Sequence, residues 1–306
     1  MLRMPTKGFS ESIHRHNCDV EPFVDWVEAS VLFLGDPVSR SDIVDRLIEN
    51  SIYRDQEFAH KWVDIVFAEL RRRIKALSQD VPIAIERSSI VRRTHWRERP
   101  AYSFCVALSM QVHYRENIPR PDFHIQGKLF EDLIAESLRA NNWSVTSVGW
   151  SHETTRSIDS RVHELAAAIG EEEIAGAVGQ WTEKHAKDSG LDLIIWQPFP
   201  DGRSGRPICL VQCASGENWD EKLHTPDLRT WQHLISFTTE PRRGLAMPFA
   251  PDHDDFRKKA GRDGVMLLLD RHRILHVRRG GAFPSTNLSR RLVDWTQDRI
   301  RHFPSE

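Results

Sequence analysis

Gly190-Leu-Asp-Leu-Ile-Ile-Trp196 and Ile208-Cys-Leu-Val-Gln-Cys-Ala214 are two short apolar runs, separated by a segment rich in Pro, Gly and Asp. Such residues turn a chain, so the two runs are expected to be the strands of a hairpin. The hairpin would bring Asp192 of the first run beside the amide of Gln212 in the second. Carboxylate and carbonyl oxygens are ligands that Mg²⁺ prefers, which predicts a metal site here. The alternative is that Asp192 is a turn or cap residue and that Gln212 is solvated.

A helix is predicted upstream, over residues 125–139. Its apolar side chains recur at helical spacing and form one stripe, which comprises Phe130, Leu133, Ile134 and Leu138. Glu131 lies at the edge of this stripe, where it can point toward a sheet. Asn141 and Asn142 end the helix, and residues 143–148 alternate as a strand does. The expected order is therefore a helix with an acidic edge residue, then three strands.

Three short motifs follow this order: G-x-x-F-E-x-L in the helix, G-x-D-L-I in the first run and Q-C-A in the second. Together they resemble the PD-(D/E)xK nuclease superfamily, and most of all its Mrr-like restriction endonuclease branch, which uses Gln in the third motif. The resemblance covers roughly residues 123–280. It implies an α/β fold with a restriction-endonuclease-like mixed central sheet flanked by helices, and cleavage of phosphodiester bonds that depends on Mg²⁺ or Mn²⁺. By position, Glu131 would be the helix acid, Asp192 the principal metal ligand and Gln212 the second strand ligand.

One position departs from the family pattern, because Ala214 stands where the family has a Lys. Lys222, at the start of the next predicted helix, is the nearest residue that could replace it, and the alternative is an ordinary surface lysine. Glu217 is either a helix N-terminal acid or a further metal ligand. Asp188 is expected to form a turn or to contact the metal's ligands without binding the metal itself. Without the Lys, a catalytically degenerate DNA-binding or assembly subunit is the second reading.

The first third of the chain predicts a smaller, mostly helical domain. Helices are expected over residues 21–33, 39–50 and 56–77, followed by strands at 81–87 and 102–108. Three helices followed by a hairpin is the order of a winged helix. We place this domain at residues 1–120 and the nuclease-like domain at 121–306, with residues 105–124 as the link.

Positive charge is concentrated in the same part of the chain. Residues 71–99 contain nine Arg or Lys against three Asp or Glu. The residues expected to contact DNA phosphates are Arg71, Arg72, Arg87, Arg92, Arg93 and Arg97. The alternatives are a solvated charged face or a docking surface for a protein.

The rest of the second domain is expected to add further strands and helices. Strands are predicted at 243–249, 264–270 and 274–277, and helices at 226–237 and 288–303, with an inserted helical pair over 158–185. The cluster from His14 to Cys18 lacks the second half that a structural zinc site needs.

Composition limits the classes of protein that fit. The chain has 306 residues, a net charge of -2 and a mean hydropathy of -0.49, and no run approaches the roughly 18 apolar residues of a membrane span. Four cysteines without C-x-x-C spacing, and an N-terminus without an apolar stretch, predict a cytoplasmic protein with reduced thiols. No phosphate-binding loop occurs, so ATP hydrolysis or targeting would come from a partner protein. The expected function is a DNA endonuclease of restriction or anti-phage defence, as a homodimer if both strands are cut.

Overall fold

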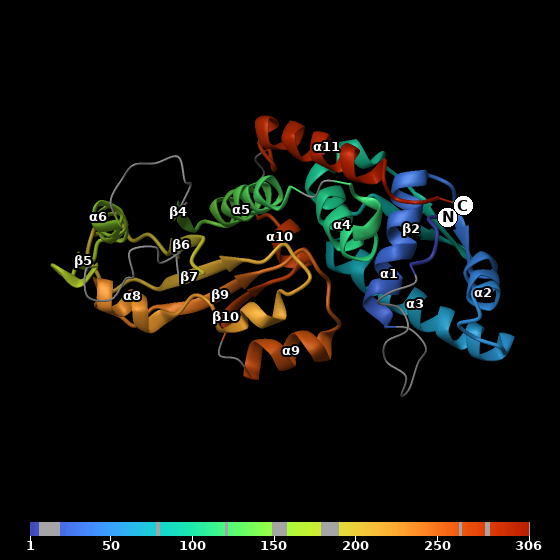
Figure 1. Cartoon of the computed structure of the whole chain (residues 1–306), viewed down its shortest axis with the longest axis horizontal. Coiled ribbons are helices and arrows are strands. Elements are labelled where there is room, and N and C mark those ends of the chain that lie inside the picture. Colours follow the sequence, from blue (N-terminus) through green and yellow to red (C-terminus); the bar gives the residue numbers. More distant parts are fainter. Residues whose placement is uncertain are drawn as a thin grey trace.

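The computed structural model describes residues 1–5, 19–77, 80–119, 122–148, 158–178, 190–262, 265–278 and 282–305. The fold is mixed α/β, as expected. Figure 1 shows an elongated molecule with a helical part at one end and a mixed sheet toward the other. Among the described residues, no helix has the length and apolar character needed to cross a membrane.

The helical part begins with the three helices that the sequence predicts. They are α1 (Val20–Ala29), which continues as a π-helical turn over Ser30–Leu34, α2 (Arg40–Glu49) and α3 (Gln56–Leu77). The N-terminus of α2 is fixed by a capping box, in which Ser39 and Asp42 each accept a hydrogen bond from the other's backbone N–H. A three-stranded antiparallel sheet of order β1-β3-β2 accompanies these helices and comprises β1 (Val38–Ser39), β2 (Ile83–Glu86) and β3 (Ser89–Arg92).

The predicted strand at residues 102–108 is wrong. This segment belongs to α4 (Pro100–His113), which follows a short 3-10 turn at Trp96–Glu98. Residues 101–111 are all buried, so α4 lacks the polar face that gives a helix its recognisable period. The same finding corrects the expected link at 105–124, because residues 105–113 belong to this helix and a 3-10 turn at Arg115–Asn117 follows them.

The helix α4 lies between the two parts of the molecule. The C-terminal helix α11 (Thr286–Ile300) packs along it, with the rings of Phe104 and Trp295 in edge contact at 4.9 Å. One continuous apolar cluster includes these two residues, Phe130 of α5 (Phe123–Ala140) and Val211 of the large sheet. The two parts therefore share a core, and their division into separate domains stays a prediction.

The large sheet has five strands in the order β10-β9-β7-β6-β4. They are β4 (Ser144–Ser147), β6 (Leu193–Trp196), β7 (Ile208–Cys213), β9 (Arg242–Ala246) and β10 (Val265–Leu269). The strand β6 is antiparallel to both β4 and β7, whereas β9 runs parallel to both β7 and β10. This arrangement is the mixed central sheet that the resemblance implies.

Helices cover the sheet and its edges. The helix α5 packs on one face, while α6 (Ile158–Ile169) and α8 (Leu228–Leu234) contribute to an apolar cluster with the other. The helix α9 (His253–Arg262), which the sequence analysis did not predict, packs beside β10. The predicted helix at 226–237 is shorter than expected, because β8 (Ile235–Ser236) pairs with β5 (Glu172–Glu173). Only part of the expected helical pair at 158–185 is observed, since residues 179–189 lie outside the described part of the chain.

The predicted strand at residues 274–277 is also wrong. The segment after β10 forms the short helix α10 (Arg271–Leu275), capped by the Asp270 side chain, which accepts a hydrogen bond from the backbone N–H of Arg273 at 2.9 Å. Side-chain capping satisfies backbone donors locally, and this favours a helical turn over a second hairpin strand.

Candidate active site

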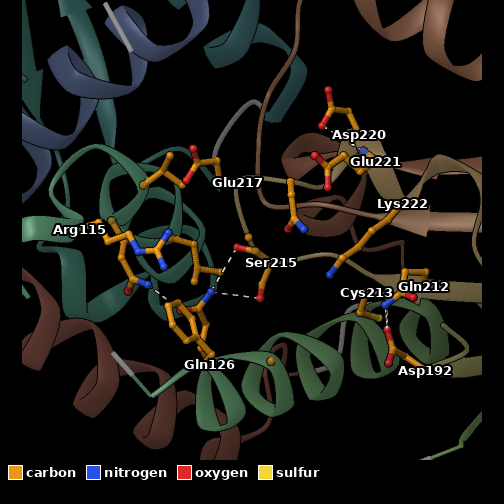
Figure 2. A pocket seen from close by; sticks show the side chains of 17 residues that line it. Arg115, Gln126, Asp192, Gln212, Cys213, Ser215, Glu217, Asp220, Glu221 and Lys222 are labelled. Atoms are coloured by element: carbon orange, nitrogen blue, oxygen red, sulfur yellow. Dashed lines mark hydrogen bonds between the residues drawn. The ribbon is translucent and has the colours of Figure 1, made fainter. Parts of the chain in front are cut away.

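The hairpin of β6 and β7 brings Asp192 and Gln212 into contact. Leu193 pairs with Val211, so the two polar residues lie opposite each other at the next position. The Gln212 amide Nε2 donates to Asp192 Oδ2 at 2.6 Å, and the backbone N–H of Cys213 donates to the same oxygen at 2.6 Å. Gln212 is 8% exposed and Asp192 is half-buried. The expected juxtaposition is therefore confirmed, and two N–H donors fix the orientation of the carboxylate (Figure 2).

Gly190 makes this close approach possible. Its φ is +77°, a left-handed conformation that other residues rarely adopt. A Cβ on Gly190 would lie 2.7 Å from Gln212 Oε1 and 2.8 Å from Thr225 Cβ. The glycine of the G-x-D-L-I motif thus has a physical role, because a side chain here would displace Gln212.

A cavity of about 850 Å³ opens beside this pair. Its walls come from α4 and the turn after it, from the start of α5, and from the end of β7 with the segment that follows it. The charged residues that line it are Asp192, Glu217, Asp220, Glu221, Arg115 and Lys222. Four carboxylates against two cations give the cavity an excess of negative charge.

Lys222 lies in the 3-10 turn Asp220–His224 and lines the same cavity. Its ammonium group points toward the Gln212–Cys213 end of β7 (Figure 2). Burial raises the pKa of the Cys213 thiol well above its usual value, the charges of Asp192 and Glu131 raise it further, and those of Lys128 and Lys222 oppose them. These four charged groups therefore lie close enough to Cys213 to act on it electrostatically.

Ala214, the position of the missing lysine, is fully buried. It packs in an apolar cluster with Leu223, Leu245, Met247 and Leu268. A lysine at this position would place its chain among these side chains. Lys222 adjoins Leu223, a member of this cluster, so the packing of Leu223 also positions the lysine that lines the cavity.

Glu131 is not among the residues that line the cavity. Its carboxylate, which is 13% exposed, pairs with Lys128 at 3.1 Å, three residues earlier on α5. Within the described ranges, no group of three or more His, Cys, Asp or Glu side chains is placed so that it could hold a metal ion. The structure thus brings Asp192, Gln212 and Lys222 together and leaves Glu131 in a neighbouring ion pair. Its role as a metal ligand stays a prediction.

Other predicted residues lie at the rim or outside the described chain. Glu217 is exposed where the cavity opens. Asp188 and the His14–Cys18 cluster fall outside the residues that the structure describes.

The sequence analysis missed the polar residues on the opposite wall. Gln111 of α4 donates from Nε2 to Gln126 Oε1 at 2.7 Å. Gln126 of α5 in turn donates from Nε2 to the backbone carbonyl of Ser215 at 3.3 Å and to its Oγ at 3.1 Å. Gln126 immediately precedes the glycine of the helix motif, and this position could have marked it as a candidate site residue. No sequence signal marked Gln111, because its segment was expected to be a link.

The six predicted DNA-binding arginines divide into two groups. Arg71, Arg87 and Arg93 are exposed, and Arg97 is exposed while stacking over the Trp96 ring at 4.7 Å. Arg72 and Arg92 are instead half-buried and bonded to groups of the protein. Arg72 pairs with Glu69 at 2.7 Å and donates to the Pro251 carbonyl, and Arg92 donates to the Leu32 carbonyl at 3.1 Å.

No protein-family model, curated protein or solved structure matches the chain.

Proposed function

We propose that the protein is a nuclease that hydrolyses DNA phosphodiester bonds with the help of Mg²⁺ or Mn²⁺. The observation that carries the proposal is the contact of Asp192 with Gln212 on a cavity that Lys222 also lines. A carboxylate, an amide and a lysine at the ends of neighbouring strands are the groups that the PD-(D/E)xK resemblance implies, with the lysine moved to the following turn.

The donor types of the cavity suit a hard divalent cation. Mg²⁺ is commonly held by one or two carboxylates while phosphate oxygens and water fill its remaining positions. Asp192 would supply the carboxylate. The Gln212 amide now turns its Nε2 toward Asp192, and rotation of this amide would present its carbonyl oxygen to the ion instead. The excess of carboxylates over cations along the walls also favours divalent cations. When bound, the ion would supply an acidified water and neutralise charge on the phosphate.

The chain's own residues would orient the reacting groups. The backbone N–H of Cys213 would keep Asp192 Oδ2 in one position when the Gln212 amide has turned toward the ion. The Lys222 ammonium, directed into the cavity, would stabilise negative charge that develops on the phosphate oxygens. Gly190 keeps the space for Gln212 free of a side chain.

We propose further that the N-terminal part is a winged-helix-like module that contacts DNA. Its support is the order α1-β1-α2-α3-β2-β3 with an antiparallel sheet of order β1-β3-β2. The exposed Arg87 at the tip of the β2–β3 hairpin and Arg93 just after it provide cations for phosphate contacts.

A binding or assembly subunit is the second candidate. It is favoured by Ala214, whose burial leaves no lysine in the usual place, and by the separation of Glu131 from the cavity. A defence setting, a partner that supplies targeting or ATP hydrolysis, and a homodimer are further parts of the proposal that follow from the resemblance alone.

Cleavage of supercoiled plasmid and linear DNA, with Mg²⁺ or Mn²⁺ and with an EDTA control, tests the choice between them. The nuclease predicts metal-dependent cutting that Asp192→Asn abolishes while DNA binding persists. Cutting retained by Asp192→Asn would remove Asp192 from the site. Absence of cutting by the unaltered protein, with DNA still bound, would favour the binding subunit.

A further inference from the structure

We infer that the wall opposite Asp192 is a binding site for one unpaired nucleobase. The inference rests on the proposed function, since it identifies the kind of DNA that the cavity takes. Figure 2 shows Arg115 and Gln126 on one side of the cavity and Asp192, Gln212 and Lys222 on the other. A volume of about 850 Å³ lies within the range of roughly 300–1,000 Å³ in which proteins hold small ligands.

The orientation of the amides on this wall is determined by one backbone carbonyl. The Ser215 carbonyl can only accept, so the Gln126 side chain must turn its Nε2 toward it. Gln126 Oε1 then faces Gln111, which must donate with its own Nε2, as the distance of 2.7 Å indicates. The Oε1 atom of Gln111 is therefore the last acceptor in this series of hydrogen bonds.

Gln111 Oε1 is a buried acceptor for which the described residues supply no hydrogen-bond partner. The side chain lines the cavity and is only 6% exposed. A buried acceptor without a donor is unfavourable by about 1–3 kcal/mol, so a ligand that brings an N–H group to it would be favoured. The amino and imino N–H groups of nucleobases are donors of this kind.

An aromatic platform lies on the same wall. Phe123, at the start of α5, lines the cavity although its side chain is 51% exposed. The Arg115 guanidinium lies 5.5 Å from the centroid of the Phe123 ring. Bases stack on exposed aromatic rings with little regard to sequence, and the arginine over one face of this ring adds a cation for the adjoining phosphate. A hydrophobic ring left exposed next to a polar acceptor is a combination that fits a flat, N–H-bearing ligand.

The substrate class follows from this geometry. A base within a duplex cannot stack on Phe123 and reach Gln111 at once, so the base must be unpaired or extruded from its duplex. The site therefore takes single-stranded DNA, or a duplex at a position where one nucleotide leaves the stack.

Binding of fluorescent octamers, in Ca²⁺ to screen the carboxylates, tests the inference without cleavage. An octamer of deoxyadenosine is compared with an abasic octamer and with an octamer of purine deoxyriboside, which stacks but lacks the amino group. We expect the abasic octamer to bind about ten-fold more weakly and the purine octamer several-fold more weakly than deoxyadenosine. Equal affinity for the deoxyadenosine and abasic octamers would overturn the inference.

Phe123→Ala and Ile125→Ala form a matched pair. Both residues are 51% exposed on the first turns of α5, but only Phe123 lines the cavity. Phe123→Ala should bring the affinity for deoxyadenosine close to that for the abasic octamer, whereas Ile125→Ala should change neither. Gln111→Met should remove the preference for deoxyadenosine over purine. Identical behaviour of the two alanine variants would count against a base site.

A bulged adenosine in an otherwise paired duplex separates the two sources of an unpaired base. A higher affinity for the bulged duplex than for the fully paired duplex would show that the site takes a base extruded from a duplex. Binding of the single strand alone would show that the ligand is single-stranded DNA. The plasmid assay is independent of these measurements. DNA cutting together with binding that does not depend on bases would support the proposed nuclease and refute the base site. Base-dependent binding without DNA cutting would support the base site and count against the nuclease.

Discussion

The guanidinium of Arg271 binds the carboxylate of Asp25 in a bidentate manner, with Nη1 and Nη2 at 3.0 and 2.9 Å from its two oxygens. The two residues are 246 positions apart, and both are almost completely buried. Arg271 also donates from Nε to the Pro248 carbonyl at 2.9 Å. Arg73 of α3 contacts the same Asp25 and pairs with Glu28 at 3.1 Å. A buried ionic network thus joins the end of the large sheet to the first and third helices.

We expect Arg271→Met to lower the free energy of unfolding by about 3–5 kcal/mol, because it leaves buried carboxylates with fewer cations. Urea denaturation followed by circular dichroism measures this change. Lys61→Ala is the control, since Lys61 and Glu57 form an exposed pair on α3 whose loss should change the stability far less. Similar changes for the two variants would mean that the buried network contributes little.

The same network predicts a loss of stability in acid. Burial alone would raise the pKa of Asp25, but the guanidinium groups of Arg271 and Arg73 hold it well below its ordinary value. A carboxyl group whose pKa is depressed by folding contributes stability that is complete above its unfolded pKa, about 3.9, and is lost as the pH falls toward the folded value. The stability difference between the wild type and Asp25→Asn should therefore shrink as the pH falls below about 4. Urea midpoints between neutral pH and strong acid measure it, and a constant difference would contradict the assignment.

Ala214→Lys, which restores the family's usual residue, should be harmful. The side chain would enter the cluster of Leu245, Met247 and Leu268, where both its volume and its charge are unfavourable. We expect a loss of about 3 kcal/mol or more in unfolding free energy, without a gain in DNA cutting. Ala76→Lys, at an exposed position of α3, is the matched control and should change stability by less than about 0.5 kcal/mol. Increased cutting by Ala214→Lys would mean that the cluster opens to admit the lysine.

The elements around the hairpin were predictable because their signals are local. The apolar stripe of α5, the turn-rich segment before Ile208 and the glycine at position 190 each identify a structure through neighbouring residues. The contact of Asp192 with Gln212 follows from hairpin register, and this is why it was expected before the structure.

The remaining features depend on contacts between distant segments. The helix α4 was mistaken for a strand and a link because burial on all sides removes its amphipathic pattern. Without α4, the Gln111–Gln126 hydrogen bond and the second wall of the cavity were not foreseeable. The pairing of Glu131 with Lys128 is local and visible as an i, i+3 spacing, but only the structure shows that this pair lies beside the cavity rather than in it.

Lys222→Ala should reduce metal-dependent DNA cutting by about 10²–10³-fold, the usual cost of losing one group that stabilises developing charge. Its stability should change little, because the residue is half-buried on the cavity wall rather than in the core. Single-turnover cleavage rates and urea denaturation measure the two effects. Lys258→Ala, on α9 and outside the cavity lining, is the control and should leave the rate unchanged. Full activity of Lys222→Ala would exclude the relocated lysine while leaving Asp192 to be tested separately.

Arg87 and Arg93 should carry the DNA binding of the N-terminal part, because both are exposed on or beside the β2–β3 hairpin. Replacing both with Ala should weaken duplex binding and lower the slope of log affinity against log salt by about 2, since each phosphate contact contributes close to 0.9. Fluorescence anisotropy at several salt concentrations measures this slope.

Two further arginines make that experiment decisive. Arg229→Ala removes an exposed arginine from α8, in the other part of the molecule, and should leave the salt slope unchanged. Arg72→Ala should lower stability instead, because the Arg72 guanidinium is bonded to Glu69 and to the Pro251 carbonyl. An unchanged slope in the double variant would show that the basic cluster is a solvated face or a surface for a protein partner. A slope lowered equally by Arg229→Ala would mean that phosphates are bound without preference for the hairpin.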